Sequence, residues 1–256
     1  MGGYTRYTRM QYNFGGIVPR GVKLLLIANS VIFVAYFLCY HGRINSLLWL
    51  FHFLSLIPDW VVLGALWQPF TYLFLHSPGG FGHILINMLM LWMFASDLER
   101  DWGIRKFFNY YFVCGAGAGL LDVAARFALG GDTGVPTIGA SGAIYGILLA
   151  FGLLYPNRTI YVMLMFPIPA RIFVLIMGVI AFLSAVAGSG GGVAHYAHLG
   201  GMLFGYFYLR YQPAVLDIDW MGSYRRWQLR RARRRFEVYM RKRNGPDDKG
   251  RGGWVN

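Results

Sequence analysis

Charged residues are scarce in this chain. Only 14% of its 256 residues are Asp, Glu, Lys or Arg, against about 25% in soluble domains, which argues against a soluble enzyme. Cysteine is rarer still. The two, Cys39 and Cys114, both lie in apolar stretches, which excludes a disulfide-rich secreted module and favours small buried core residues. The abundant residues are apolar and gather in runs of roughly 17–23, the length that crosses a bilayer core as helix. The sequence therefore indicates a polytopic helical membrane protein.

The apolar runs predict an all-α fold with six membrane-spanning helices. They are expected at 22–40, 82–98, 107–129, 140–155, 169–187 and 195–211. The first run is too long for the core of a signal peptide, and no A-x-A-like cleavage site follows it, so we expect a retained span. The chain is therefore expected to have three parts, namely an N-terminal segment (1–21), a six-span domain (22–211) and a basic C-terminal tail (212–256).

The distribution of basic residues predicts the orientation in the membrane. All but two of the 24 Lys and Arg fall on the side that holds both termini, and only Arg43 and Arg126 fall on the other. By the positive-inside rule, both termini are expected in the cytoplasm. The basic stretch 225–243 follows directly after a span, so we expect it to lie on anionic lipid headgroups rather than to bind nucleic acid.

The connection between the first two spans is long and unusually apolar. Residues 41–81 hold many aromatic side chains and almost no charge, and they are interrupted by Pro58 and Pro69. Irregular backbone at membrane depth is tolerated only where it packs on protein. We therefore expect short helical pieces lying at the interface or dipping partway into the bilayer.

Polar side chains cluster at one end of three spans. His83 and Asn87 open the second span, Ser141 opens the fourth, and His195 and His198 open the sixth. These three spans run in the same direction, so their first turns are expected at one depth, just below the outer surface. Small residues recur at four-residue spacing on the fourth and sixth spans, which favours close packing of those two helices. Buried polar residues in a membrane are functional candidates.

This layer has the groups needed for acyl transfer. A serine hydroxyl needs a base to take its proton, and histidine is the usual one. Backbone N–H groups at a helix start, with the side chains of His83 and Asn87, would bind the negative oxygen of a tetrahedral intermediate. Because no acidic residue lies in the layer, a Ser–His dyad is expected rather than a triad.

Three motifs resemble those of the rhomboid intramembrane serine proteases. GASG around Ser141, HILIN from His83 to Asn87 and AHLGG around His198 are similar to the family's G-x-S-G, H-x-x-x-N and A-H-x-x-G, in the family's order. WQPFTYLFLH (67–76) and LERDWGIRKF (98–107) also resemble family segments. The likeness covers about residues 20–211.

The resemblance implies a role for each matching residue. Ser141 would be the nucleophile and His198 the general base, while His83, Asn87 and the Ser141 N–H would bind the oxyanion. Tyr145 would pack against the base, and Gly139 would keep the approach to the serine open. The family cleaves transmembrane segments of other membrane proteins without a cofactor or metal. The compact form resembles bacterial members, so a bacterial inner membrane is expected. In one departure, Gln68 stands after the tryptophan of the first loop, where many relatives have an arginine.

Several alternatives stay open beside this interpretation. A six-span protein that lacked catalysis would be a rhomboid-like scaffold that binds transmembrane helices, although such proteins typically lack the serine or the histidine. His195 is expected to be structural or at the rim of the site. His195 and His198 together have no third clustered ligand and no H-E-x-x-H motif, which argues against a zinc protease. Asp122 and Arg126, four residues apart, are expected to form a structural pair.

Overall fold

The structure, a computed structural model, describes residues 18–162, 165–187 and 195–211, with a few more between 229 and 237. Two units, Met1–Leu216 and Asp217–Asn256, divide the chain. All the helices and strands named below belong to the first unit. Most of the expected N-terminal segment and of the basic tail lies outside the described residues.

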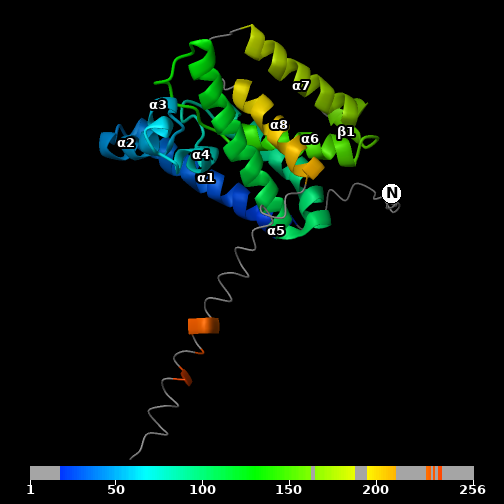
Figure 1. The fold of residues 1–256 in the computed structure, drawn as a ribbon, viewed down its shortest axis with the longest axis horizontal. Coiled ribbons are helices and arrows are strands. Elements are labelled where there is room, and N and C mark those ends of the chain that lie inside the picture. The colour runs from blue at the N-terminus through cyan, green and yellow to red at the C-terminus, as the bar shows by residue number, and fades with distance from the viewer. Residues whose placement is uncertain are drawn as a thin grey trace, which may run out of the picture. The chain divides into compact units, whose positions relative to one another are not determined.

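Five long helices build the unit, and they are drawn in Figure 1. They are α1 (Arg20–His41), α5 (Gly82–Leu129), α6 (Ser141–Leu154), α7 (Ala170–Val186) and α8 (His195–Tyr211). Their bounds agree with the expected spans to within a few residues, except that α5 contains both the second and the third. The mostly helical fold is therefore confirmed.

A break at Gly103 divides α5. The residue has φ 77° and ψ 160°, a conformation that glycine adopts readily and other residues avoid. The two arms, 82–102 and 104–129, run in opposite directions, because the start of the first arm and the end of the second both meet residues 137–139. The two expected spans are thus present as separate helical arms.

One part of the all-α prediction is wrong. An antiparallel hairpin, β1 (Thr159–Val162) and β2 (Phe166–Pro169), joins α6 to α7, with Ile160 opposite Ile168. Pro167 and Pro169 disfavour helix in the second strand. The first strand is rich in β-branched and aromatic residues, which pack well on a pleated surface. The hairpin is short and does not interrupt a span.

Two described helices are long and apolar enough to cross a membrane, namely α1 and α5. The helices α6 and α7 are apolar but shorter, with 14 and 17 residues. Together with the family reported below, these apolar helices make the chain an integral membrane protein. The count of six spans stays a prediction.

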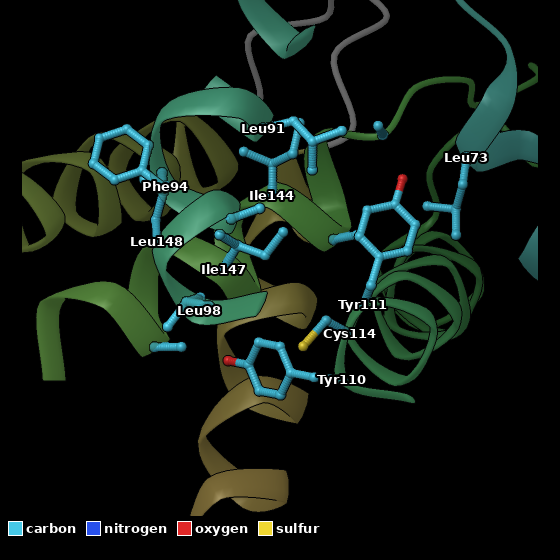
Figure 2. Close-up of a cluster of buried hydrophobic side chains, with 14 of the residues drawn as sticks. Leu73, Leu91, Phe94, Leu98, Tyr110, Tyr111, Cys114, Ile144, Ile147 and Leu148 are labelled. Atoms are coloured by element: carbon cyan, nitrogen blue, oxygen red, sulfur yellow. The ribbon is translucent and has the colours of Figure 1, made fainter. Parts of the chain in front are cut away.

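The helix α6 lies at the centre of the core. Figure 2 shows Ile144, Ile147 and Leu148 of α6 among apolar side chains from both arms of α5. The Tyr110 hydroxyl donates to the Gly146 carbonyl over 2.6 Å, which pins the second arm of α5 to α6. Cys39 and Cys114 are both free and buried, as expected.

Glycine allows α6 and α8 to approach closely. A Cβ on Gly201 would collide with the Gly142 carbonyl oxygen, and one on Gly146 would lie 2.9 Å from the Gly201 carbonyl oxygen. Any larger residue would force the helices apart. The small-residue spacing therefore marks the crossing of the fourth and sixth expected spans.

Two carboxylates, the buried Glu99 and the partly buried Asp97, tie elements together near the end of the first arm of α5. The start of α1 has no side-chain cap of its own. Instead, the Gly21 and Val22 N–H groups each donate to one oxygen of Glu99 over 2.7 Å. A carboxylate at a helix start also complements the helix dipole. Nearby, Arg158 pairs with Asp97 at 2.8 Å and links the α6–β1 turn to the first arm of α5.

The long connection forms the expected short helical pieces. They are α2 (Asn45–Leu54), α3 (Pro58–Val62), α4 (Gln68–Thr71) and the 3₁₀ turn η1 (Tyr72–Phe74). Gln68, the departure from the family pattern, is fully buried and fastens this connection. Its amide oxygen accepts from the Ile57 N–H at 2.9 Å, and its amide nitrogen donates to the Phe53 carbonyl at 3.1 Å.

Candidate active site

Ser141 and His198 meet across the crossing of α6 and α8. Ser141 is the first residue of α6, and His198 lies in the first turn of α8. His198 Nε2 is 2.8 Å from Ser141 Oγ, a hydrogen-bonding distance. The two side chains are partly buried. A hydroxyl and an imidazole in this geometry can exchange a proton.

Tyr145 holds the imidazole from the other side. Its ring stacks on that of His198 with centroids 4.2 Å apart and planes 6° from parallel. Tyr145 is one helical turn after Ser141, so α6 carries two groups that contact His198. The stack restricts rotation of the imidazole, which keeps Nε2 directed at the serine.

Gly139 places the backbone just before the serine. Its φ of +124° strains any residue with a side chain, and a Cβ there would lie 3.0 Å from His83 Nε2. Its N–H donates to the Tyr72 carbonyl at 3.0 Å. Glycine is therefore needed here both for the backbone turn and for the approach of His83.

His83 and Asn87 are four residues apart on one face of α5, and His83 lies next to this turn. The Ser77 N–H points to His83 Nδ1 at 3.4 Å, so Nδ1 is the acceptor. In a neutral imidazole the other nitrogen then carries the proton, which makes Nε2 a donor beside Gly139. The Asn87 amide nitrogen donates one hydrogen to the His83 carbonyl at 2.8 Å. Its second hydrogen is a further donor on this side.

The segment before the serine is braced from two directions. Thr137 and Leu56 exchange backbone hydrogen bonds of 3.0 and 2.8 Å, which joins the segment to the α2–α3 connection. From the other side, Arg126 Nη2 contacts Asp122 at 3.2 Å and donates to Thr137 Oγ1 at 2.6 Å. The expected structural role of Asp122 and Arg126 is thus confirmed, and their pair steadies the approach to Ser141.

His195 lies at the edge of the pair. Its ring centroid is 6.2 Å from that of His198, with the planes at 76°. Residues 188–194, just before it, are outside the described part of the chain. The expectation that His195 is structural or at the rim stays a prediction.

Sequence reasoning gave no role to Tyr72 and His76, which support the site from behind. The Tyr72 hydroxyl donates to the Gly115 carbonyl at 2.8 Å, in addition to the bond from Gly139. His76 is fully buried, with its ring centroid 5.1 Å from that of His83. Burial, with a smaller effect from His83, lowers the pKa of His76 to about 3, so its ring is neutral. Both residues lie in the WQPFTYLFLH stretch, so the resemblance marked the segment but not their contacts.

The fold and the polar layer define a class: a helical membrane protein with a serine and a histidine paired between the first turns of two closely packed helices. Comparison with known families agrees. The family model described as "Rhomboid domain" matches residues 63–212. The chain belongs to the rhomboid family, as the motifs predicted.

Three relatives illustrate the likeness. "Rhomboid protein 1, mitochondrial" of Saccharomyces cerevisiae is 34% identical over half of this chain and 37% of its own length. "Rhomboid protease GluP" of Bacillus subtilis is 31% identical over 64% of this chain and 29% of its own. "Rhomboid-like protein 16, chloroplastic" of Arabidopsis thaliana is 28% identical over 71% and 60%.

The matched part of the chain thus spans less than two thirds of the length of each of these relatives, from 29% to 60%. Some are named as proteases and others only as rhomboid-like. Mitochondrial and chloroplastic proteins stand beside bacterial ones, so the expected bacterial inner membrane has no support from the relatives.

Proposed function

We propose that this protein is an intramembrane serine endopeptidase that cleaves transmembrane segments of other membrane proteins with a Ser141–His198 dyad. The observation that carries the proposal is the 2.8 Å contact between Ser141 Oγ and His198 Nε2 at the crossing of α6 and α8. A serine at a helix start ordinarily bonds to its own backbone as a cap. Here its hydroxyl faces an imidazole from another helix instead.

In the first step, His198 Nε2 takes the proton of Ser141 Oγ as that oxygen attacks a substrate carbonyl carbon. The carbonyl π bond breaks, and its oxygen becomes an oxyanion. The imidazolium then gives the proton to the leaving nitrogen, the C–N bond breaks, and an acyl-enzyme remains. Water, deprotonated by His198, hydrolyses the ester and restores the serine.

We assign oxyanion binding to His83 Nε2–H, the free hydrogen of the Asn87 amide and the Ser141 backbone N–H. His83 Nε2 lies beside Gly139, Asn87 is one helical turn further along α5, and the Ser141 N–H is at the start of α6. Donors fixed before the reaction stabilise developing charge without reorganising. The helix dipole of α6 adds a favourable partial charge at the same point.

We further propose a six-span domain at 22–211 with both termini in the cytoplasm, no cofactor, and a basic tail on anionic headgroups. In this orientation, the end of the bundle that holds Glu99, Arg100 and Arg158 is cytoplasmic and the serine lies near the outer surface. Substrates are then membrane proteins whose spanning segments unwind near that surface.

Cleavage in proteoliposomes tests the proposal. Wild type is reconstituted with a single-span reporter that carries small residues near the outer end of its span. We expect wild type to cleave it and Ser141→Ala to leave it intact. Ser96→Ala is the matched control, because Ser96 Oγ bonds within its own helix to the Trp92 carbonyl at 2.6 Å. A wild type that binds the reporter without cutting it would instead support the non-catalytic scaffold.

A further inference from the structure

A groove runs between α6, α7 and α8, away from the candidate active site. It has a volume of about 410 Å³, within the range of small-ligand sites. Its lining is apolar apart from one residue. The lining includes Gly152, Leu153, Arg171, Gly178, Phe182 and Met202. In Figure 1, α7 lies at the edge of the bundle beside α8.

A glycine, which has no side chain, helps to form this groove. Gly178 presents no side chain in the middle of α7, where an added Cβ would meet only Met202, with Sδ at 3.5 Å and Cε at 3.7 Å. On another side of α7, Phe173 stacks on Phe94 of α5 with centroids 5.6 Å apart. The helix packs mainly on α8 and α6 and also touches α5 through Phe173. At Gly178 it presents no side chain to α8, and the groove passes over this position.

A single cation marks one end of the groove. Arg171 lies in the first turn of α7 and is exposed. Its backbone N–H bonds to the Pro156 carbonyl, so it is close to the turn that carries Arg158. The two arginines differ in their partners. Arg158 pairs with Asp97 at 2.8 Å, whereas no carboxylate among the described residues contacts Arg171.

The length of the groove along α7 matches about half of the thickness of the bilayer's hydrocarbon core. From Arg171 to Phe182 the helix rises about 16 Å at 1.5 Å per residue, which is about half of the ~30 Å hydrocarbon core. The length and the apolar lining of the groove suit an extended acyl chain.

We propose that this groove binds an anionic phospholipid of the cytoplasmic leaflet. An acyl chain lies along α7 over Gly178 toward Phe182, and the Arg171 guanidinium binds the headgroup phosphate. Arginine suits this role because its planar donors match phosphate oxygens in pairs. Anionic lipids gather on the cytoplasmic side, the side on which Arg171 is expected.

The test measures the lipid that the purified protein retains, and it does not depend on proteolytic activity. Protein in mild detergent is mixed with palmitoyl-oleoyl phosphatidylglycerol or the matching phosphatidylcholine, and bound lipid is measured by native mass spectrometry. We expect wild type to retain one phosphatidylglycerol at low ionic strength and at least tenfold less phosphatidylcholine. Salt weakens exposed ion pairs, so retention also falls as salt is raised.

Two variants separate the headgroup from the acyl chain. Arg171→Gln removes the cation, and we expect the preference for phosphatidylglycerol to disappear. Gly178→Leu fills the groove, and we expect retention of both lipids to fall about tenfold. Arg43→Gln and Leu183→Phe are the matched controls outside the groove, and both should bind as wild type. Melting temperatures near that of wild type show that each variant is folded.

Three outcomes would overturn the proposal. Equal phosphatidylglycerol retention by Arg171→Gln and wild type would remove the headgroup contact, and unchanged retention by Gly178→Leu would remove the acyl site. A second copy of this chain cross-linked through cysteines placed at Leu175 and Leu153 would identify a protein occupant instead. Because lipid is measured directly, these results are independent of whether the serine cleaves peptides.

Discussion

At the scale of single residues, the serine and the histidine are held by groups that differ in kind. The Tyr145 ring fixes the plane of His198, while Gly139 fixes the backbone before Ser141 by a positive φ. His83 and Asn87 are the proposed oxyanion donors. Changes at these positions should therefore affect rate and stability in different proportions.

Replacing Asn87 by alanine tests its assignment as an oxyanion donor. Loss of such a donor costs roughly 10²–10³ in rate, so we expect Asn87→Ala to keep partial activity with kcat reduced by that factor. Asn29 offers a matched control. Its amide donates to the Leu25 carbonyl at 2.8 Å, as that of Asn87 does to the His83 carbonyl, but it lies in α1. Equal kcat values for Asn87→Ala and wild type would remove Asn87 from this role.

His76 should make stability depend on pH. Its pKa is lowered to about 3 in the folded protein, against about 6.5 when unfolded. The folded state therefore binds fewer protons between these values. The stability that the neutral His76 ring contributes is present above pH 6.5 and is lost as the pH falls toward 3. From pH 7.5 to pH 5 this amounts to about 2 kcal/mol.

The measurement is thermal unfolding in detergent at pH 7.5 and pH 5. The melting temperature of wild type should fall by more between these values than that of His76→Phe, which cannot be protonated. His41→Gln changes an exposed histidine and should keep the wild-type pH dependence. If His76→Phe lost as much stability on acidification as wild type, His76 would not be the group responsible.

At the scale of elements, the crossing of α6 and α8 decides whether the serine meets the histidine. Gly201→Ala puts a Cβ against the Gly142 carbonyl, and such overpacking costs about 1–3 kcal/mol. Gly178→Ala is the control, since its Cβ makes an ordinary contact and alanine favours helix. We expect Gly201→Ala to lower the melting temperature by several degrees and Gly178→Ala to leave it unchanged or raised. If Gly201→Ala melted at the same temperature as wild type, the close crossing of α6 and α8 would be refuted.

Much at this scale could be predicted from the sequence. Apolar runs gave the long helices to within a few residues, and the shared direction of three spans placed Ser141 and His198 in one layer. The hairpin at 159–169 was missed, because two four-residue strands are too short to produce a clear alternating pattern. The Gly103 break separated two expected spans, but its φ of 77° has no signature beyond the glycine itself.

The supporting contacts of the site could not be predicted, since they depend on distant backbone atoms. Gln68 is buried by its bonds to Ile57 and Phe53, and nothing in its immediate neighbourhood predicts these partners. The same holds for Tyr72, whose hydroxyl reaches Gly115 in another helix. Motifs identify the residues that perform chemistry, whereas tertiary packing determines which residues hold them in place.

At the scale of the whole molecule, the two ends of the bundle are built differently. One end holds the buried Glu99 and the Asp97–Arg158 pair, together with Arg171 and the groove. The other holds the polar layer and the Asp122–Arg126 pair. This separation suits a protein that performs its chemistry near one membrane surface and is anchored by charge and lipid at the other.

The most direct test of the central claim is labelling with a fluorophosphonate, which reacts with activated serines. Purified wild type in detergent is compared with Ser141→Ala, His198→Ala and the control Ser96→Ala, and each is also tested in liposomes. We predict that wild type and Ser96→Ala are labelled and that Ser141→Ala and His198→Ala are not. Folded wild type that stays unlabelled in both detergent and liposomes, or labelling that survives Ser141→Ala, would contradict it.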